Sequence, residues 1–148
     1  MIEAVRSASI VYLDSAPLVY YIQDNQTFSG LISPIIDAIA RGEKQGVTSY
    51  LTLLELLVMP FKKKRGDLAD KYRRVLLKSP HMRLLPLGED VAEEAARIRA
   101  SYRFRTPDAV QLASAKLSRA DIFITNDRKL RRYKEIRVLV LSEHLGKT

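Results

Sequence analysis

Short runs of β-branched and aliphatic residues alternate with longer stretches of helical periodicity, and this alternation constrains the fold more than any other feature. We expect strands at residues 9–13, 46–49, 82–87, 121–125 and 136–141. We expect helices between them, at residues 15–22, 28–39, 50–59, 68–76, 91–102 and 106–117. This order predicts one α/β domain over residues 1–148, with a mainly parallel central sheet flanked by helices on both faces.

Several residues are suited to begin or end the predicted helices. Thr106 is the expected cap of the last helix, with the following proline at the first helical position. Gly42 and Pro60 are expected to end the helices that precede them. Pro34 leaves two possibilities, because it either kinks its helix or lies in a first turn capped by Ser33.

The composition excludes several kinds of protein. The absence of cysteine excludes a disulfide framework and a cysteine-based zinc site, and His81 and His144 lie too far apart to suggest a histidine-rich metal site. Glu3 and Arg6 interrupt any apolar run at the N-terminus, so we expect no signal peptide. No segment approaches the roughly 18 apolar residues of a membrane span. We therefore expect a cytoplasmic protein without membrane contact. We also expect the last residues of the chain, from Ser142 onward, to be loosely held.

The net charge bears on the choice of partner. The chain has 25 Lys and Arg against 17 Asp and Glu, a formal net charge of +8. Such an excess on a small domain favours polyanionic partners, although simple solubility explains it equally well. Charge alone therefore leaves nucleic-acid binding open.

Four acidic residues lie where an open α/β sheet places its ligand sites, outside the carboxyl ends of the strands. Asp14 follows the first predicted strand and Asp127 follows the fourth. Asp108 lies in the first turn of a helix that should begin near the same edge, and Glu55 lies one to two turns into the helix after the second strand. We expect these four carboxylates to converge.

Each acid also has a purely structural interpretation. Asp14 and Asp127 suit turns or caps, and Asp108 suits the positive end of a helix dipole. Glu55 is harder to explain in this way, because four leucines and a valine flank it and its helix is expected to be buried nearly all round. A buried carboxylate needs a partner, and a metal ion or a polar cleft is the simplest one.

Clustered carboxylates repel one another unless a cation neutralises them. Mg²⁺ and Mn²⁺ prefer oxygen ligands, so either ion is the expected cofactor of the four acids. Four cations near these acids are candidates to hold substrate phosphates: Arg105, Arg128, Lys129 and Arg131. The equal alternative is that they only form a solvated cationic face. The cationic run at residues 62–65 is interpreted as an exposed loop.

Four stretches in this order and spacing, "VYLDSAPLVYYI", "TSYLTLLELL", "RTPDAVQLASA" and "FITNDRKL", resemble the PIN domain and most of all the VapC-like toxin ribonucleases of prokaryotic toxin–antitoxin modules. The resemblance runs from about residue 10 to residue 141 and implies a Rossmann-like three-layer fold. It also implies a metal-dependent endoribonuclease that acts on RNA, forms a homodimer and is inhibited by a cognate antitoxin.

The resemblance assigns roles by position. Its catalytic and metal-binding acids correspond to Asp14, Glu55, Asp108 and Asp127. Its supporting polar residues correspond to Ser15, Thr125 and Asn126. The sequence departs from the pattern at Ala16, where the family often has Asn or Ser, and this puts in doubt a hydrogen bond beside the first acid.

The sequence lacks the motifs of two other small α/β domains. A phosphoacceptor receiver domain needs adjacent acids near the first strand, and Asp14 has no acidic neighbour. A P-loop needs a helix after its Gly-Lys-Thr, and the sequence has this tripeptide only at residues 146–148. Two alternatives remain: a non-catalytic PIN-like module that binds RNA or a protein, and a nuclease of the same kind that cuts DNA or a flap. The retained set of four acids favours the enzyme.

Overall fold

The computed structural model describes residues 1–146. The last two residues of the Gly-Lys-Thr tripeptide, Lys147 and Thr148, lie outside this range. Within that range the chain forms a five-stranded sheet in the order β3-β2-β1-β4-β5, and all four strand pairs are parallel. The strands are β1 (Ile10–Leu13), β2 (Gln45–Ser49), β3 (Met82–Leu85), β4 (Ile122–Thr125) and β5 (Arg137–Val140). The predicted α/β class is confirmed, and the described sheet is parallel throughout.

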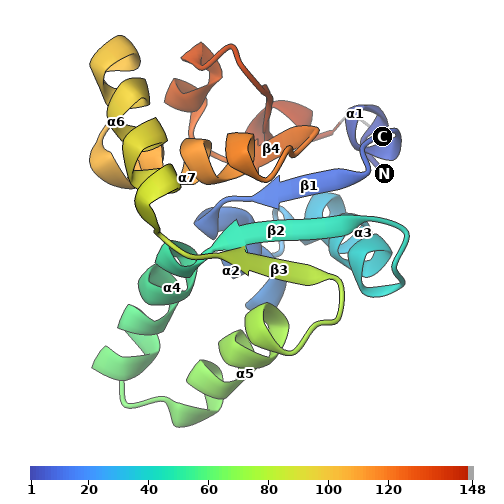
Figure 1. Ribbon diagram of the computed structural model, residues 1–148. Helices are drawn as coiled ribbons and strands as arrows, with labels where there is room; N and C mark the ends of the chain where they lie inside the picture. Colours follow the sequence, from blue (N-terminus) through green and yellow to red (C-terminus); the bar gives the residue numbers. More distant parts are fainter. Residues whose placement is uncertain (147–148) are drawn as a thin grey trace.

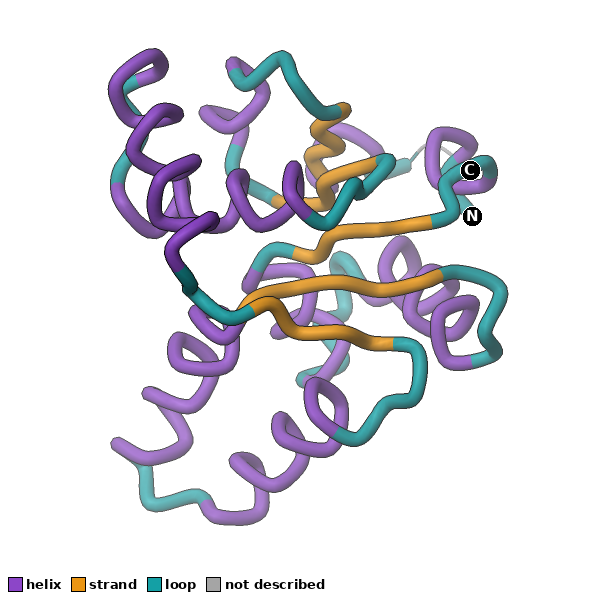
Figure 2. The backbone as a smooth tube through the Cα atoms, viewed as in Figure 1, coloured by secondary structure: helices purple, strands orange, loops and turns teal. Residues whose placement is uncertain are grey.

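Helices cover both faces of this sheet, so the architecture has three layers (Figure 1). They are α1 (Glu3–Arg6), α2 (Ser15–Ile22), α3 (Ser29–Ala40), α4 (Tyr50–Lys62), α5 (Gly66–Leu77), α6 (Glu89–Tyr102) and α7 (Thr106–Leu117). Two 3₁₀ turns, η1 (Arg128–Arg132) and η2 (Leu141–His144), follow β4 and β5. In Figure 2 the strands form the middle of the molecule, with helices on either side.

The alternation of side chains along β1 divides the interior into two cores. Val11 and Leu13 point to one face of the sheet, where they pack with residues of α2, α3, α4 and α5. Tyr12 points to the other face, where it stacks on Phe123 at a centroid distance of 5.2 Å and packs with α6 and α7. β1 is therefore buried on both faces, as expected for the middle strand of a parallel sheet.

The predicted end of α3 at Gly42 is confirmed. The helix ends at Ala40, and Gly42 adopts a left-handed conformation with φ of +80°. A Cβ atom at this position would lie 2.9 Å from Nε2 of His81, so the position requires glycine for both conformation and space.

Pro34 and Pro60 both lie inside helices, which excludes the first-turn possibility for Pro34. Ser33 does not cap Pro34, because α3 begins at Ser29. The carbonyl group that loses its partner there belongs to exposed Gly30, where water can replace the missing N–H. The expected end of α4 at Pro60 is also wrong, since the helix continues to Lys62.

The expected cap of α7 is also wrong. Thr106 is the first residue of α7, and extended Arg105 occupies the cap position without a side-chain hydrogen bond. Such shifts of one or two residues are common at helix ends, where backbone geometry rather than residue type sets the boundary.

The two ends of the described chain are both tied to the body of the protein. Near the N-terminus, the ammonium group of buried Lys44 donates hydrogen bonds to the carbonyl oxygens of Val5, Arg6 and Ala8 at 2.7, 3.0 and 2.6 Å. Near the C-terminus, the N–H of Ser142 donates to Oδ1 of Asn126 at 2.9 Å. The part of the expected loose tail beyond Gly146 falls outside the described residues. Across residues 1–146, every helix is too short or too polar to cross a membrane.

Candidate active site

The carboxyl ends of β1 and β2 lead directly into α2 and α4, and α7 packs against β2, so three helices contribute residues to one edge of the sheet (Figure 1). The site is built at this edge.

Asp14 is the most constrained acid of the edge. It caps α2, and its Oδ1 accepts a hydrogen bond from the N–H of Ser15 at 2.8 Å. Its Oδ2 accepts a hydrogen bond from the hydroxyl of Thr125 at 2.7 Å. Burial raises the pKa of Asp14 to about 6 against the opposing effect of these two hydrogen bonds, and the charges of Glu55 and Asp108 raise it further. The charges of two acids from separate elements therefore act on Asp14.

Glu55 reaches the edge from α4, but its surroundings differ from the expectation. The residue is exposed, and its Oε1 accepts a hydrogen bond from the hydroxyl of Ser15 at 3.0 Å. The expectation that α4 is buried all round is wrong, because Leu54 and Phe61 are 60% and 58% exposed. Only one face of α4 packs against the protein, and the apolar sequence could not show that the other face has no cover within the described chain.

Asp108 lies in the first turn of α7, and its side chain is 17% exposed. Nε of Arg105 lies 3.3 Å from its Oδ2. This cation, expected to hold a phosphate, therefore partly neutralises an acid of the edge in the absence of a ligand.

Asp127 is used differently from the other three acids. Its Oδ1 accepts a hydrogen bond from the N–H of Lys129 at 3.0 Å, which caps η1. Its charge is not among the causes that raise the pKa of Asp14. The cap interpretation therefore describes its side-chain contact, and Thr125 links Asp127 to Asp14 because its hydroxyl donates to Asp14 and accepts the N–H of Asp127.

The three residues expected to support the acids have different contacts. Ser15 and Thr125 both donate to acids of the edge, and Thr125 also accepts the N–H of Asp127 at 3.1 Å. The side-chain amide of Asn126 instead donates to the hydroxyl of Tyr20 at 2.9 Å and accepts from the N–H of Ser142. Asn126 thus ties the end of β4 to α2 and to η2.

A buried polar cluster behind the acids was missed in the sequence. Its centre is Gln111 of α7, which is 2% exposed. Nε2 of Gln111 lies 3.5 Å from Oε1 of Glu55. Oε1 of Gln111 accepts hydrogen bonds from the hydroxyls of Tyr12 and Ser49, and Nε2 donates to Thr52 at 2.9 Å. A glutamine within the apolar run "AVQLASA" was the only signal for this cluster.

The donor atoms at the edge fit a hard divalent cation. They are carboxylate and hydroxyl oxygens, the ligand type of Mg²⁺ and Mn²⁺. Burial and, to a smaller extent, the charges of Glu55 and Asp108 raise the pKa of Asp14, and a bound cation would oppose both effects. Within residues 1–146, however, no three acidic or histidine side chains are gathered into a closed metal cage. An ion that retains several waters and takes one or two carboxylates suits this open arrangement.

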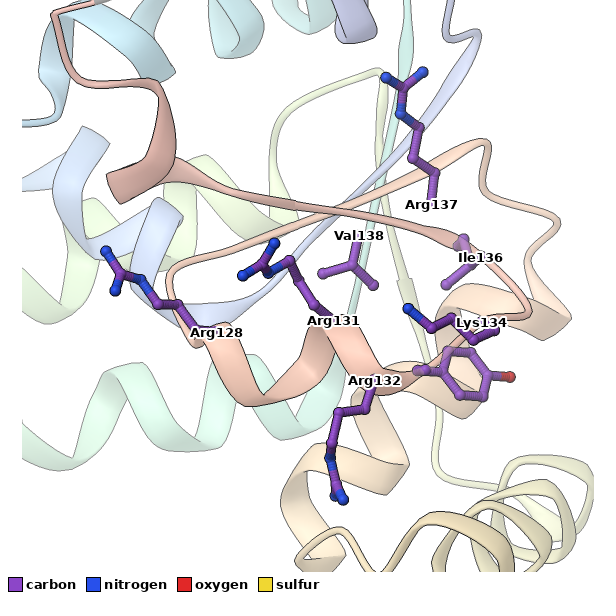
Figure 3. Close-up of a pocket in the computed structure, with 8 residues that line it drawn as sticks. Arg128, Arg131, Arg132, Lys134, Ile136, Arg137 and Val138 are labelled. Atoms are coloured by element: carbon purple, nitrogen blue, oxygen red, sulfur yellow. The ribbon is translucent and has the colours of Figure 1, made fainter.

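The other cations expected to contact phosphates lie on η1. Arg128 and Lys129 are exposed, and Nη2 of Arg131 forms an ion pair with Glu143 at 2.9 Å. Arg128 and Arg131 line a hollow between η1 and β5 (Figure 3), and Lys129 does not.

Together, the parallel sheet, the two helical layers and the acidic carboxyl edge define a Rossmann-like α/β protein with an acidic site. The family model of the PIN domain matches residues 11–136. The chain belongs to the PIN domain family, which confirms the family resemblance of its four sequence stretches.

Several solved structures with the same fold are described as VapBC proteins or as toxin–antitoxin complexes. A chain of VapBC2 from Rickettsia felis, bound to a DNA fragment from its promoter, has a TM-score of 0.70 and 14% identity, over 88% of this chain and 98% of that chain. A chain of a toxin–antitoxin complex from Klebsiella pneumoniae has a TM-score of 0.67 and 20% identity, over 88% and 96%. A chain of VapBC-5 from Mycobacterium tuberculosis has a TM-score of 0.57 and 23% identity, over 90% and 98%. No curated protein shows significant similarity to the chain.

Proposed function

We propose that this protein is a metal-dependent endoribonuclease and the toxin of a toxin–antitoxin module. It would hydrolyse RNA phosphodiester bonds and leave a 5′-phosphate and a 3′-hydroxyl. The observation that carries the proposal is the meeting of Asp14, Glu55 and Asp108, from three elements, at one edge of the sheet, with a raised pKa at Asp14. Membership of the PIN family and the toxin–antitoxin origin of the structural neighbours support it.

Each residue of the edge has a role in this proposal. Asp14, Glu55 and Asp108 would hold Mg²⁺ or Mn²⁺, with Asp127 as the fourth acid. A bound divalent cation would supply charge to the phosphoryl oxygens and lower the pKa of a water molecule. Thr125 and Ser15 fix the orientations of the first two acids through their hydrogen bonds.

Arg105 would exchange partners when the site is loaded. Its guanidinium group contacts Asp108 at 3.3 Å and is otherwise exposed, with 72% of its side chain accessible. A cation on Asp108 would weaken that ion pair by repulsion and turn Arg105 toward a substrate phosphate.

A cleavage assay tests the proposal. Purified protein should cut end-labelled single-stranded RNA with Mg²⁺ or Mn²⁺ and should stop cutting when a chelator is added. Only products with a 5′-phosphate can be ligated without prior phosphorylation, which checks the polarity of cleavage. Cleavage that persists undiminished in chelator would contradict the metal role.

A non-catalytic module that binds RNA or a protein is the second candidate. The use of Asp127 as a cap and the lack of a closed metal cage within residues 1–146 favour it. The same assay separates the two, because this module would bind the RNA and leave it intact with either metal.

We also propose an inhibitory antitoxin as a protein partner, because one neighbouring structure is described as a toxin–antitoxin complex and another as a member of the VapBC family of toxin–antitoxin systems. Co-expression with the product of a small adjacent gene should yield a stable complex without ribonuclease activity. A complex that cuts RNA as fast as the isolated protein would contradict this partner.

We further propose that a second copy of the chain covers the exposed face of α4. Tyr50, Leu54 and Val58 lie four residues apart on one stripe, which continues to Phe61. Such a stripe on one helix suits an isologous two-fold contact, in which the helices run antiparallel. This pairing would bring the cationic end of one α4, at residues 62–65, toward the acidic edge of the other copy.

Sedimentation of matched variants tests the dimer. Leu54→Glu should give a monomer, whereas Leu87→Glu should leave the dimer intact, because Leu87 is equally exposed but lies outside α4. A monomeric wild type, or a dimer that tolerates Leu54→Glu, would contradict the contact.

A further inference from the structure

A concentration of positive charge lies beside the acidic edge, in the hollow between η1 and β5 (Figure 3). Its volume is about 600 Å³. Its lining contains no acidic residue and consists of Arg128, Arg131, Arg132, Tyr133, Lys134, Ile136, Arg137 and Val138. Five of these eight residues are cations, and all five are exposed.

Two of the five cations are held by the protein itself. Nη2 of Arg132 donates to the carbonyl oxygen of Tyr102 at 2.7 Å, and its guanidinium group stacks 4.7 Å from the ring centroid of Phe104. Arg131 pairs with Glu143. Within residues 1–146, Arg128, Lys134 and Arg137 form no ion pair in this structure. The hollow therefore keeps a surplus of positive charge that the described chain does not neutralise.

The hollow extends away from the acids along the side of the sheet. Arg128 directly follows Asp127 at the carboxyl end of β4, whereas Arg137 is the first residue of β5 and lies at the opposite end of the parallel strands. Four residues of strand span roughly 13 Å. Cations spread over this length suit a ligand with a row of negative charges better than a single anion.

We infer that this cationic hollow is a second binding site, outside the metal site, for the ribose–phosphate backbone of single-stranded RNA. The inference rests on the proposed ribonuclease function and extends it, because it assigns Arg132, Lys134 and Arg137 to the substrate path. RNA held at the acidic edge passes over Arg128 and continues along β5. From the sequence alone, cations of η1 were expected near the acids. Only the fold shows that Lys134 and Arg137 line the same hollow as Arg128 and Arg131.

Salt-dependent RNA binding of a double variant tests the site. Lys134→Gln with Arg137→Gln removes two cations that are remote from the acids and make no ion pair within residues 1–146. Binding of labelled RNA of about 4 and about 14 nucleotides is followed by fluorescence anisotropy in chelator, which prevents metal-dependent cleavage. The slope of log affinity against log salt should become shallower by about 1.4 for the long RNA, at about 0.7 per phosphate, and by less for the short RNA, which has too few phosphates to contact all the cations at once.

The change in this slope also predicts how much RNA affinity the double variant loses. If variant and wild type bind equally at 1 M salt, the variant binds the long RNA about 25-fold more weakly at 0.1 M. Lys71→Gln with Lys78→Gln is the matched control, because these exposed lysines of or next to α5 lie beyond the other edge of the sheet. Equal losses in control and test variants would overturn the site and leave only a general effect of net charge.

Further results separate the possible ligands and functions. If a polyglutamate peptide of equal charge displaces the long RNA more effectively than unlabelled RNA does, the hollow belongs to an acidic protein and the inference fails. If the protein does not cut RNA but the double variant loses affinity as expected, the hollow stands and the proposed nuclease fails. If the protein cuts RNA but the slope is unchanged, the hollow alone fails.

Discussion

The acidic edge and the cationic hollow lie side by side at the end of β4, yet they are organised in opposite ways. The acids of the edge are held in place: Asp14 accepts two hydrogen bonds, and Glu55 accepts one from Ser15. The cations of the hollow are exposed, and Arg128 and Lys134 form no ion pair within the described chain.

The difference corresponds to two physical tasks. Cleavage requires a reacting group at a defined position, and small displacements reduce the rate strongly. Attraction of a polyanion depends on the amount of charge and tolerates side-chain mobility. The edge should therefore be sensitive to every buried contact around it, whereas the hollow should respond mainly to the number of its cations.

The largest expected effect is on cleavage by the edge. Asp14→Asn keeps the size of the side chain but removes a charge that the proposed cation requires. We expect the rate of RNA cleavage to fall by on the order of 10³-fold or more, equivalent to about 4 kcal/mol. Asp127→Asn should cost less, because asparagine can still cap η1. Exposed Asp37 of α3 provides the control as Asp37→Asn, and similar rates for all three variants would refute the acidic site.

The next effect concerns the pH dependence of stability without metal. The pKa of Asp14 is raised from 3.8 to about 6 in the folded protein, so the folded state binds this proton more tightly than the unfolded state. The resulting stability is fully present below pH 3.8 and is lost as the pH rises through 6. The loss at pH 8 is at most about 3 kcal/mol.

Asp14→Asn should remove this dependence. In chelator at pH 8 the variant should melt several degrees above the wild type, and the difference should shrink near pH 4. Circular dichroism melts at both pH values measure it. A variant that is less stable than wild type at pH 8 would show that Asp14 serves the fold as a cap and does not carry an unfavourable charge.

A smaller effect is expected from the support behind the edge. Gln111→Leu leaves the buried hydroxyl of Tyr12 without its acceptor and removes the amide near Glu55, at a cost of about 1–3 kcal/mol. Urea unfolding measures the loss of stability, and metal titration should show weaker binding. Val110→Leu on the same helix provides a control for repacking. Undiminished stability in the Gln111 variant would show that the cluster is not required.

The smallest expected effect is on the stability contributed by the hollow. Lys134→Gln and Arg137→Gln should each change the free energy of unfolding by less than about 0.5 kcal/mol, because both side chains are exposed and unpaired within residues 1–146. Arg132→Gln should cost more, because it loses the contacts with Tyr102 and Phe104. Equal costs for all three would remove the distinction between held and available cations.

Much of the fold followed from local patterns in the sequence. All five strands were predicted within a few residues, because short β-branched runs between helical stretches are a local signal. Gly42 was predicted as a helix end for an equally local reason, its tolerance of positive φ. The helix end at Pro60 was predicted wrongly, since a proline removes one hydrogen bond and does not by itself end a helix. For Pro34, one of the two open possibilities, a place in the first turn, was excluded.

The sequence by itself determined the order of strands and helices and the positions of the acids that follow them. Only the tertiary structure decided that Ser15 donates hydrogen bonds to both Asp14 and Glu55, whereas Asp127 caps η1. It also decided that one face of α4 is exposed and that Arg128 and Arg137 line one hollow. The physical reason is that propensity and periodicity act over a few neighbouring residues. Burial, charge coupling and shared cavities depend on segments that meet only after the sheet has formed.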